Sequence, residues 1–204
     1  VGISILTITG VPDGADTVSS LLALASGVFF GLSGLLSQRV LYTHEVSRTI
    51  PITQASPIFA AILALAILNE AITPLQWLGI ITTVVGSTLI SLRTDELSGN
   101  IFLDKSFYLL ILSAFFFGAA SVIGKLALDE LPLVITHGLR MLAVGIIFLI
   151  FSFRSESWRD VKRFFKERSP ALLFVSTNEF ITANVGLITF LWALSIGPAS
   201  LVSA

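Results

Sequence analysis

Glu179 is the residue whose type and position in this sequence are best suited to proton chemistry. It lies about nine residues into an apolar segment, 170–195, and three more polar side chains surround it there: Asn178, Thr182 and Asn184. A carboxylate at that depth in an apolar helix is costly unless it pairs with a cation or faces water. Burial favours the protonated form of a carboxyl group, which suits the loading and release of a proton. Two interpretations stay open: a proton-coupling or substrate-contact site, and a structural ion pair with Arg140 or Lys125.

A second polar group, Thr53, Gln54 and Ser56, lies beside Pro57 in another apolar segment. A proline inside a helix removes one backbone hydrogen bond and kinks the helix. Membranes tolerate such a kink mainly where the helix faces protein or a wet cavity. The polar side chains are either interhelical hydrogen-bond donors or the lining of a cavity, and Gln54 is the better cavity candidate.

The elements that must position these residues are helices in a lipid bilayer. The chain is 54% hydrophobic and 12% charged, which is typical of a polytopic membrane protein. Each crossing needs roughly 20 apolar residues. About six complete spans satisfy this requirement: 19–42, 49–69, 74–92, 106–128, 133–153 and 170–195. Because the chain starts and ends inside apolar sequence, we expect it to be a piece of a longer protein.

Composition also argues against several functions. A net charge of −1 gives no reason to expect a nucleic-acid partner, and the absence of cysteine removes thiolate chemistry. His44 and His137 are isolated, so we expect neither a metal site nor a cofactor. The sequence contains no HExxH or GxSxG motif, which indicates that the protein is not an enzyme and has no catalytic residue.

The hairpin 56–92 has a recognisable order of residues. Its hinge, 69–72, contains Glu70, and Thr73 and Pro74 follow as N-cap and first helical residue. Near a helix N-terminus, a structural role for Glu70 is favoured over a proton site. The motif residues of the hairpin are Pro57, Glu70, Gln76, Gly79 and Gly86.

The second half carries a related order: a helix with Ala114 and Gly118 that ends near Lys125, a short acidic link, and then Arg140. Lys125 is expected to extend toward the lipid surface, and Arg140 to be a packing residue. With the hairpin, this order resembles the EamA-type transporters of the drug/metabolite transporter superfamily.

The resemblance implies an all-α membrane bundle of two inverted repeats of five helices. Residues 1–94 would form the first repeat, 95–105 a linker and 106–204 the second repeat; Ser47 and Ser200 occupy matching places in the two. It implies a multi-pass secondary transporter in the cell membrane (plasma or inner) that moves small organic metabolites by alternating access. Candidate partners are the small-molecule substrate, protons, the lipid bilayer and a second copy of the chain. The alternative class is a non-transport scaffold or an intramembrane enzyme.

Two further expectations concern packing and orientation. Gly27 and Gly31 have the small-residue spacing that lets helix backbones approach closely. Ten of the twelve Lys and Arg residues fall on one side of the predicted bundle, which places the basic, amphipathic segment 153–169 in the cytoplasm, lying on lipid. The usual arrangement of the resembled family would place it on the opposite side.

Overall fold

The computed structural model describes residues 17–42, 46–92, 105–152, 174, 177–178 and 180–203. Within this part of the chain the structure is helical and contains no strand, which confirms the all-α class. The predictions made for residues 1–16, for the linker, for the basic segment 153–169 and for Glu179 lie outside the described residues. The elements are α2 (Thr17–Leu41), α3 (Val46–Thr53), α4 (Ser56–Ile67), α5 (Pro74–Leu92), α6 (Lys105–Leu128), α7 (Leu133–Ser152), the π-helix η2 (Thr182–Gly186), α10 (Leu187–Ile196) and α11 (Ala199–Val202).

The described helices confirm a polytopic bundle. Four stretches are long and apolar enough to cross a membrane: Thr17–Leu41, Thr49–Ile67, Lys105–Leu128 and Leu133–Phe151. Two further predicted spans, 74–92 and 170–195, coincide within the described residues with the apolar helical stretches Pro74–Gly86 and Asn184–Ile196. The arrangement as two inverted repeats stays a prediction.

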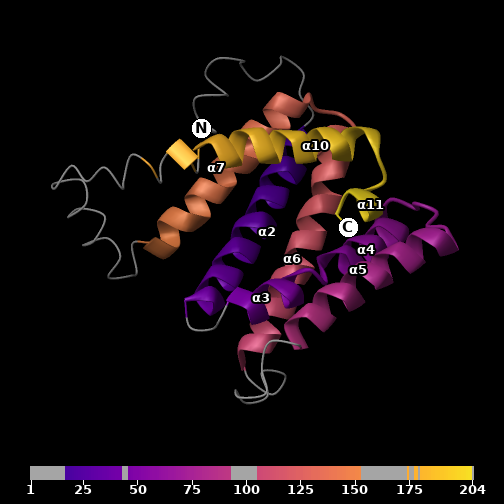
Figure 1. Ribbon diagram of the computed structural model, residues 1–204. Helices are drawn as coiled ribbons and strands as arrows, with labels where there is room; N and C mark the ends of the chain where they lie inside the picture. The colour runs from indigo at the N-terminus through magenta and orange to yellow at the C-terminus, as the bar shows by residue number, and fades with distance from the viewer. Residues whose placement is uncertain are drawn as a thin grey trace.

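Helix α2 lies beside α6 and α7 near the middle of the bundle (Figure 1). Its glycines make the contact with α7 close, because a Cβ atom at Gly27 would clash with the backbone oxygen of Arg140 and lie 2.8 Å from Cβ of Ala143. One turn later, a Cβ atom at Gly31 would lie 3.2 Å from Ile147. The predicted packing role of the Gly27–Gly31 spacing is confirmed.

Serine side chains hold α2 against α6. The hydroxyl of Ser26 donates to the carbonyl of Ala120 at 2.8 Å. Ser33 and Ser113 donate to each other's carbonyl oxygens, both at 2.8 Å. From the contact of Ser26 to that of Ser33, the bonded residue moves toward the C-terminus of α2 and, by the same number of residues, toward the N-terminus of α6. The two helices are therefore antiparallel. Hydroxyl-to-carbonyl bonds of this kind stabilise helix pairs in lipid, where water cannot replace them.

Helix α4 approaches α6 at Gly118. A Cβ atom there would lie 2.8 Å from the backbone nitrogen of Ala60, so only glycine fits without a shift. Beyond this contact, apolar side chains of α4, α6, α10 and α11 form one buried cluster: Ala64, Val122, Leu191, Leu194 and Ala199. The motif glycines of α5 behave differently, because a Cβ atom added at Gly79 or Gly86 would meet no neighbouring described atom within 4 Å. Helix packing within the described part of the chain therefore does not account for them.

The second span is broken rather than bent. Helix α3 ends at Thr53, Gln54 and Ala55 form a turn, and α4 begins at Ser56 with Pro57 in its first turn. Pro57 has no N–H to donate to the Thr53 carbonyl, so the helical hydrogen-bond ladder cannot run through this point. The predicted disruption at Pro57 is confirmed, although it takes the form of two helices.

The hinge between α4 and α5 has defined caps at both ends. Asn69 adopts a left-handed conformation with φ of 52°, which asparagine tolerates better than most residues. Thr73 and Gln76 bond reciprocally: the Gln76 side chain accepts from the Thr73 N–H at 2.7 Å, and the Thr73 hydroxyl accepts from the Gln76 N–H at 3.3 Å. This is a capping box, and it confirms Thr73 as the N-cap of α5.

Candidate functional site

A polar cavity of about 420 Å³ lies where the broken second span faces α2 and α6. Most of its lining side chains carry a hydroxyl or an amide, and none is charged. The lining residues are Ser33, Ser37, Leu41, Thr49, Ile50, Thr53, Gln54, Ser56, Ser113, Ala114, Phe117, Phe190 and Ser203. Such a surface can hydrogen-bond uncharged polar groups of a small molecule.

The break in the second span brings Thr53, Gln54 and Ser56 to this cavity. The Thr53 hydroxyl donates locally to the carbonyl of Ile50 at 2.7 Å, and Gln54 is exposed. Because Pro57 supplies no amide hydrogen, the carbonyl of Thr53 lacks the usual helical donor at the same place. Their substrate role stays a prediction.

Four serines of the lining were missed from sequence. Ser33 and Ser37 come from α2, Ser113 comes from α6, and Ser203 follows α11. A usable signal was present, because Ser26 and Ser33 recur on the glycine-bearing helix at a spacing that keeps them on one face. Ser33 and Ser113 both join the helices and line the cavity.

Aromatic side chains close one wall. Phe117 and Phe190 line the cavity, and their ring centroids are 5.9 Å apart. On its other side the Phe117 ring contacts Phe30, with centroids 5.8 Å apart.

The polar residues predicted around Glu179 do not line this cavity. Asn178 and Thr182 are exposed. Asn184 is half-buried, and its amide donates to the carbonyl of Phe180 at 2.6 Å. Thr182 and Asn184 lie in η2, a turn of π-helix, and such turns recur at functional sites. Among the described residues, the structure therefore does not bring the two predicted polar groups together.

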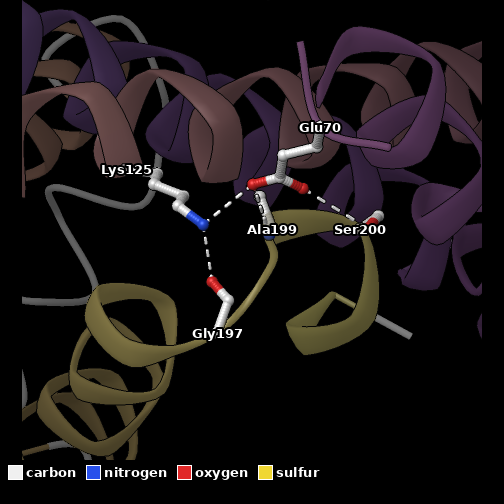
Figure 2. A network of polar contacts seen from close by, with 5 residues as sticks. All are labelled: Glu70, Lys125, Gly197, Ala199 and Ser200. Atoms are coloured by element: carbon white, nitrogen blue, oxygen red, sulfur yellow. Dashed lines mark hydrogen bonds and ion pairs between the residues drawn. The ribbon is translucent and has the colours of Figure 1, made fainter. Parts of the chain in front are cut away.

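Glu70 and Lys125 meet at the end of the bundle where α4 joins α5 (Figure 2). Lys125 Nζ donates to Glu70 Oε1 at 2.8 Å and to the carbonyl of Gly197 at 2.6 Å. Glu70 Oε1 also accepts from the Ala199 N–H at 3.1 Å, and Oε2 accepts from the Ser200 hydroxyl at 3.5 Å. We refer to these five residues as the Glu70 cluster.

The electrostatics of the Glu70 cluster favour an ionised carboxylate. Burial by itself would raise the pKa of Glu70. The hydrogen bonds from Lys125 and the Ala199 backbone, together with the lysine charge, outweigh burial and hold this pKa below its ordinary value. Lys125 thus binds a carboxylate rather than extending to the lipid surface, and the helix that Glu70 caps is α11, not α5. Among the described residues, no three His, Asp or Glu side chains lie together in a way that could hold a metal ion.

Arg140 and His137 form a second buried polar group, one turn apart on α7. Both are 0% exposed. The guanidinium lies 4.5 Å from the centroid of the Phe30 ring. Asn184 is adjacent to His137, but neither ring nitrogen makes a hydrogen bond of normal geometry with a described residue. Arg140 packs between helices as predicted, yet its three nitrogens also have no partner in the described part of the chain.

Comparison with known proteins gives one family. The model of the EamA-like transporter family matches residues 4–92 and 105–204. No curated protein and no solved structure matches the chain.

Proposed function

Because the chain belongs to the EamA-like transporter family, we propose that it is a secondary transporter that moves a small organic metabolite by alternating access. Membership of this family supports membrane transport in general. The cavity at the broken second span supports the more specific proposal, that a small organic metabolite is moved by alternating access. Secondary transporters bind their substrates at discontinuous helices, where backbone groups freed from the helix can line a cavity. The break at Gln54 and Ala55 has this character.

The dimensions of the cavity support a small solute. Sites for small molecules measure roughly 300–1,000 Å³, and the volume here is about 420 Å³. Hydroxyls of α2 and α6 line the same cavity as the amide of Gln54. They can pair with the hydroxyl, carbonyl or amide groups of a metabolite, while Phe117 and Phe190 contact its apolar atoms.

The Glu70 cluster supports alternating access because it joins the two predicted repeats. Glu70 precedes α5 in the first, whereas Lys125, Gly197 and Ala199 belong to the second. Chain order places this cluster at the opposite end of the bundle from the link between α2 and α3, beside which the cavity lies. Rocking one repeat against the other would break these contacts at one stage of a cycle and restore them at another.

The proposal extends to location and coupling. A multi-pass bundle of this kind would act in the cell membrane, plasma or inner, with protons as the candidate coupling ion. It assigns no catalytic residue. A scaffold or an intramembrane enzyme, the alternative class, would move no solute across a sealed membrane.

Counterflow in sealed lipid vesicles tests the proposal. Vesicles containing the purified protein are loaded with an unlabelled metabolite and diluted into a trace of the labelled compound, across a panel of small organic solutes. Transient accumulation of label for at least one solute is expected, since an alternating-access carrier exchanges faster than it returns empty. No accumulation for any solute, with correctly folded protein, would contradict the proposal.

A matched pair of variants tests the role of the cavity. Gln54→Leu removes the amide from the lining, whereas Gln38→Leu makes the same change at an exposed position of α2 that is not part of the lining. We expect the first to raise the half-saturating solute concentration roughly tenfold, as loss of about one hydrogen bond implies. The second should leave it unchanged. Equal effects would remove the cavity from the substrate path.

A further inference from the structure

We propose that Arg140 binds a carboxylate group of the transported solute, an inference that rests on the transport function proposed above. The substrate class is then a small organic monocarboxylate that also carries polar, uncharged groups.

Among the described residues, the guanidinium of Arg140 is a buried cation without an anion. Its side chain is 0% exposed, and Nε, Nη1 and Nη2 have no hydrogen-bond partner among the described residues. Arginine stays protonated inside proteins. The Phe30 ring, 4.5 Å from the guanidinium carbon, compensates only part of the cost of removing this charge from water. An anion at these nitrogens is required to balance the positive charge of the guanidinium.

Glycine at position 124 limits the crowding of the Arg140 guanidinium. A Cβ atom at Gly124 would lie 3.3 Å from Nη1 of Arg140 and 3.0 Å from the hydroxyl oxygen of Ser26. Any side chain at this position would therefore crowd Nη1, and glycine avoids that contact. The planar guanidinium presents parallel N–H donors that match the two oxygens of a carboxylate.

His137 adds a second donor beside the first. It is also 0% exposed, and neither ring nitrogen makes a hydrogen bond of normal geometry with a described residue. Arg140 is near enough for its charge to act on the imidazole, and Asn184 of η2 adjoins the ring. One cation with a neutral donor nearby balances a single negative charge. A phosphate dianion would keep one charge uncompensated, so the geometry favours a monocarboxylate.

Two aromatic rings connect Arg140 to the polar cavity through successive contacts. Arg140 lies over Phe30, Phe30 contacts Phe117 at 5.8 Å between centroids, and Phe117 lines the cavity. A carboxylate that enters from the cavity reaches the guanidinium when these rings turn aside. The uncharged part of the solute then stays among the hydroxyls of the cavity.

Thermal unfolding of the purified full chain in detergent tests the inference with defined probes. Acetate, lactate and benzoate are compared with acetamide, lactamide and benzamide at equal ionic strength set by sodium chloride. We expect at least one carboxylate, and not its amide, to raise the unfolding temperature of the wild type by several degrees. The inference is overturned if no carboxylate stabilises the protein more than its amide does.

Variants assign the effect to Arg140. Arg140→Gln should abolish the response, whereas Arg39→Gln, the same change at an exposed arginine of α2, should retain it. If Arg140→Gln does not fold, Arg140→Lys decides, because lysine keeps the charge but loses the two-pronged geometry. In Arg140→Lys, the carboxylate concentration that gives half of the stabilisation should rise roughly tenfold or more, because the variant loses about one hydrogen bond to a charged group. An unchanged response in either variant overturns the inference.

Glu179 is another source of a carboxylate in this chain, and one arm of the experiment separates it from the solute. If the wild type does not respond and only Glu179→Gln is stabilised by carboxylates, the anion at Arg140 comes from the protein, and the inference about the solute is wrong. If the wild type and Glu179→Gln respond alike, the solute supplies it. The counterflow experiment separates a wrong inference about Arg140 from a wrong transport proposal. If only the inference about Arg140 is wrong, uncharged solutes still exchange.

Discussion

The ammonium of Lys125 lies 2.8 Å from the carboxylate of Glu70, although 55 residues separate the two in sequence. The same carboxylate oxygen accepts the backbone N–H of Ala199, and Lys125 also donates to Gly197. One acidic and one basic side chain therefore fasten the hinge of α4 and α5, the end of α6 and the link between α10 and α11. Both residues belong to the pattern by which the sequence resembles its family.

Separating this pair should destabilise the fold. The side chains are 20% exposed for Lys125 and 14% for Glu70, so each variant leaves its partner partly buried and unpaired. Glu70→Gln and Lys125→Met should each lower the free energy of unfolding by about 1–3 kcal/mol. The double variant should lose less than the sum, because the partners share one interaction. Unfolding in detergent measures all three, and strictly additive losses would show that the pair does not interact.

Stability should depend on pH through Glu70. Its pKa is lower in the folded protein than the ordinary value of 4.5, so folding favours the ionised form. The contribution is complete above the ordinary pKa and is lost as the pH falls through the folded pKa. The unfolding temperature of wild type minus that of Glu70→Gln, measured between about pH 7 and pH 3, should shrink at the acid end. A difference that grows toward acid would contradict the assignment.

Gly118 should tolerate no side chain. A Cβ atom there lies 2.8 Å from the backbone nitrogen of Ala60, so Gly118→Ala pushes α4 away from α6 at a cost of about 1–3 kcal/mol. Gly145→Ala is the matched control, because a Cβ atom added there on α7 would meet no neighbouring described atom within 4 Å. It should be neutral or stabilising by up to about 1 kcal/mol, since alanine is the better helix former. Comparable losses in both variants would argue against the close contact of α4 with α6.

Pro57→Ala should join α3 to α4. Restoring an N–H at residue 57 gives the Thr53 carbonyl its helical donor, so the turn at Gln54 and Ala55 can close into one helix. We expect a small rise in helix content by circular dichroism, intact membrane insertion and transport lowered several-fold, since the cavity is built on this turn. Normal transport would make the proline a packing feature only.

Glu179→Gln tests proton coupling. Glutamine keeps the shape and hydrogen bonding of the side chain but cannot ionise. We expect the variant to fold and insert normally while solute uptake no longer responds to an imposed pH gradient. Wild-type proton dependence in this variant would remove Glu179 from the coupling path.

The sequence alone determined the features that depend on local chemistry. The length of the apolar segments predicted the membrane spans. Pro57 predicted where the second span is interrupted, and Thr73 with Pro74 predicted the start of α5. Gly27 and Gly31 predicted the face of α2 that packs closely against a neighbouring helix. Each of these follows from the residues within a turn or two, because helix propensity, capping and hydropathy act over that range.

The partnerships were decided only by the tertiary structure. The contacts of Ser33 with Ser113, of Glu70 with Lys125, and of the Arg140 guanidinium with the Phe30 ring each join different elements of the fold. Which side chains meet depends on the rotation and axial register of each helix against its neighbours. In lipid these are set by the steric fit of small residues such as Gly118 against Ala60, since apolar helices gain little from hydrophobic burial against each other.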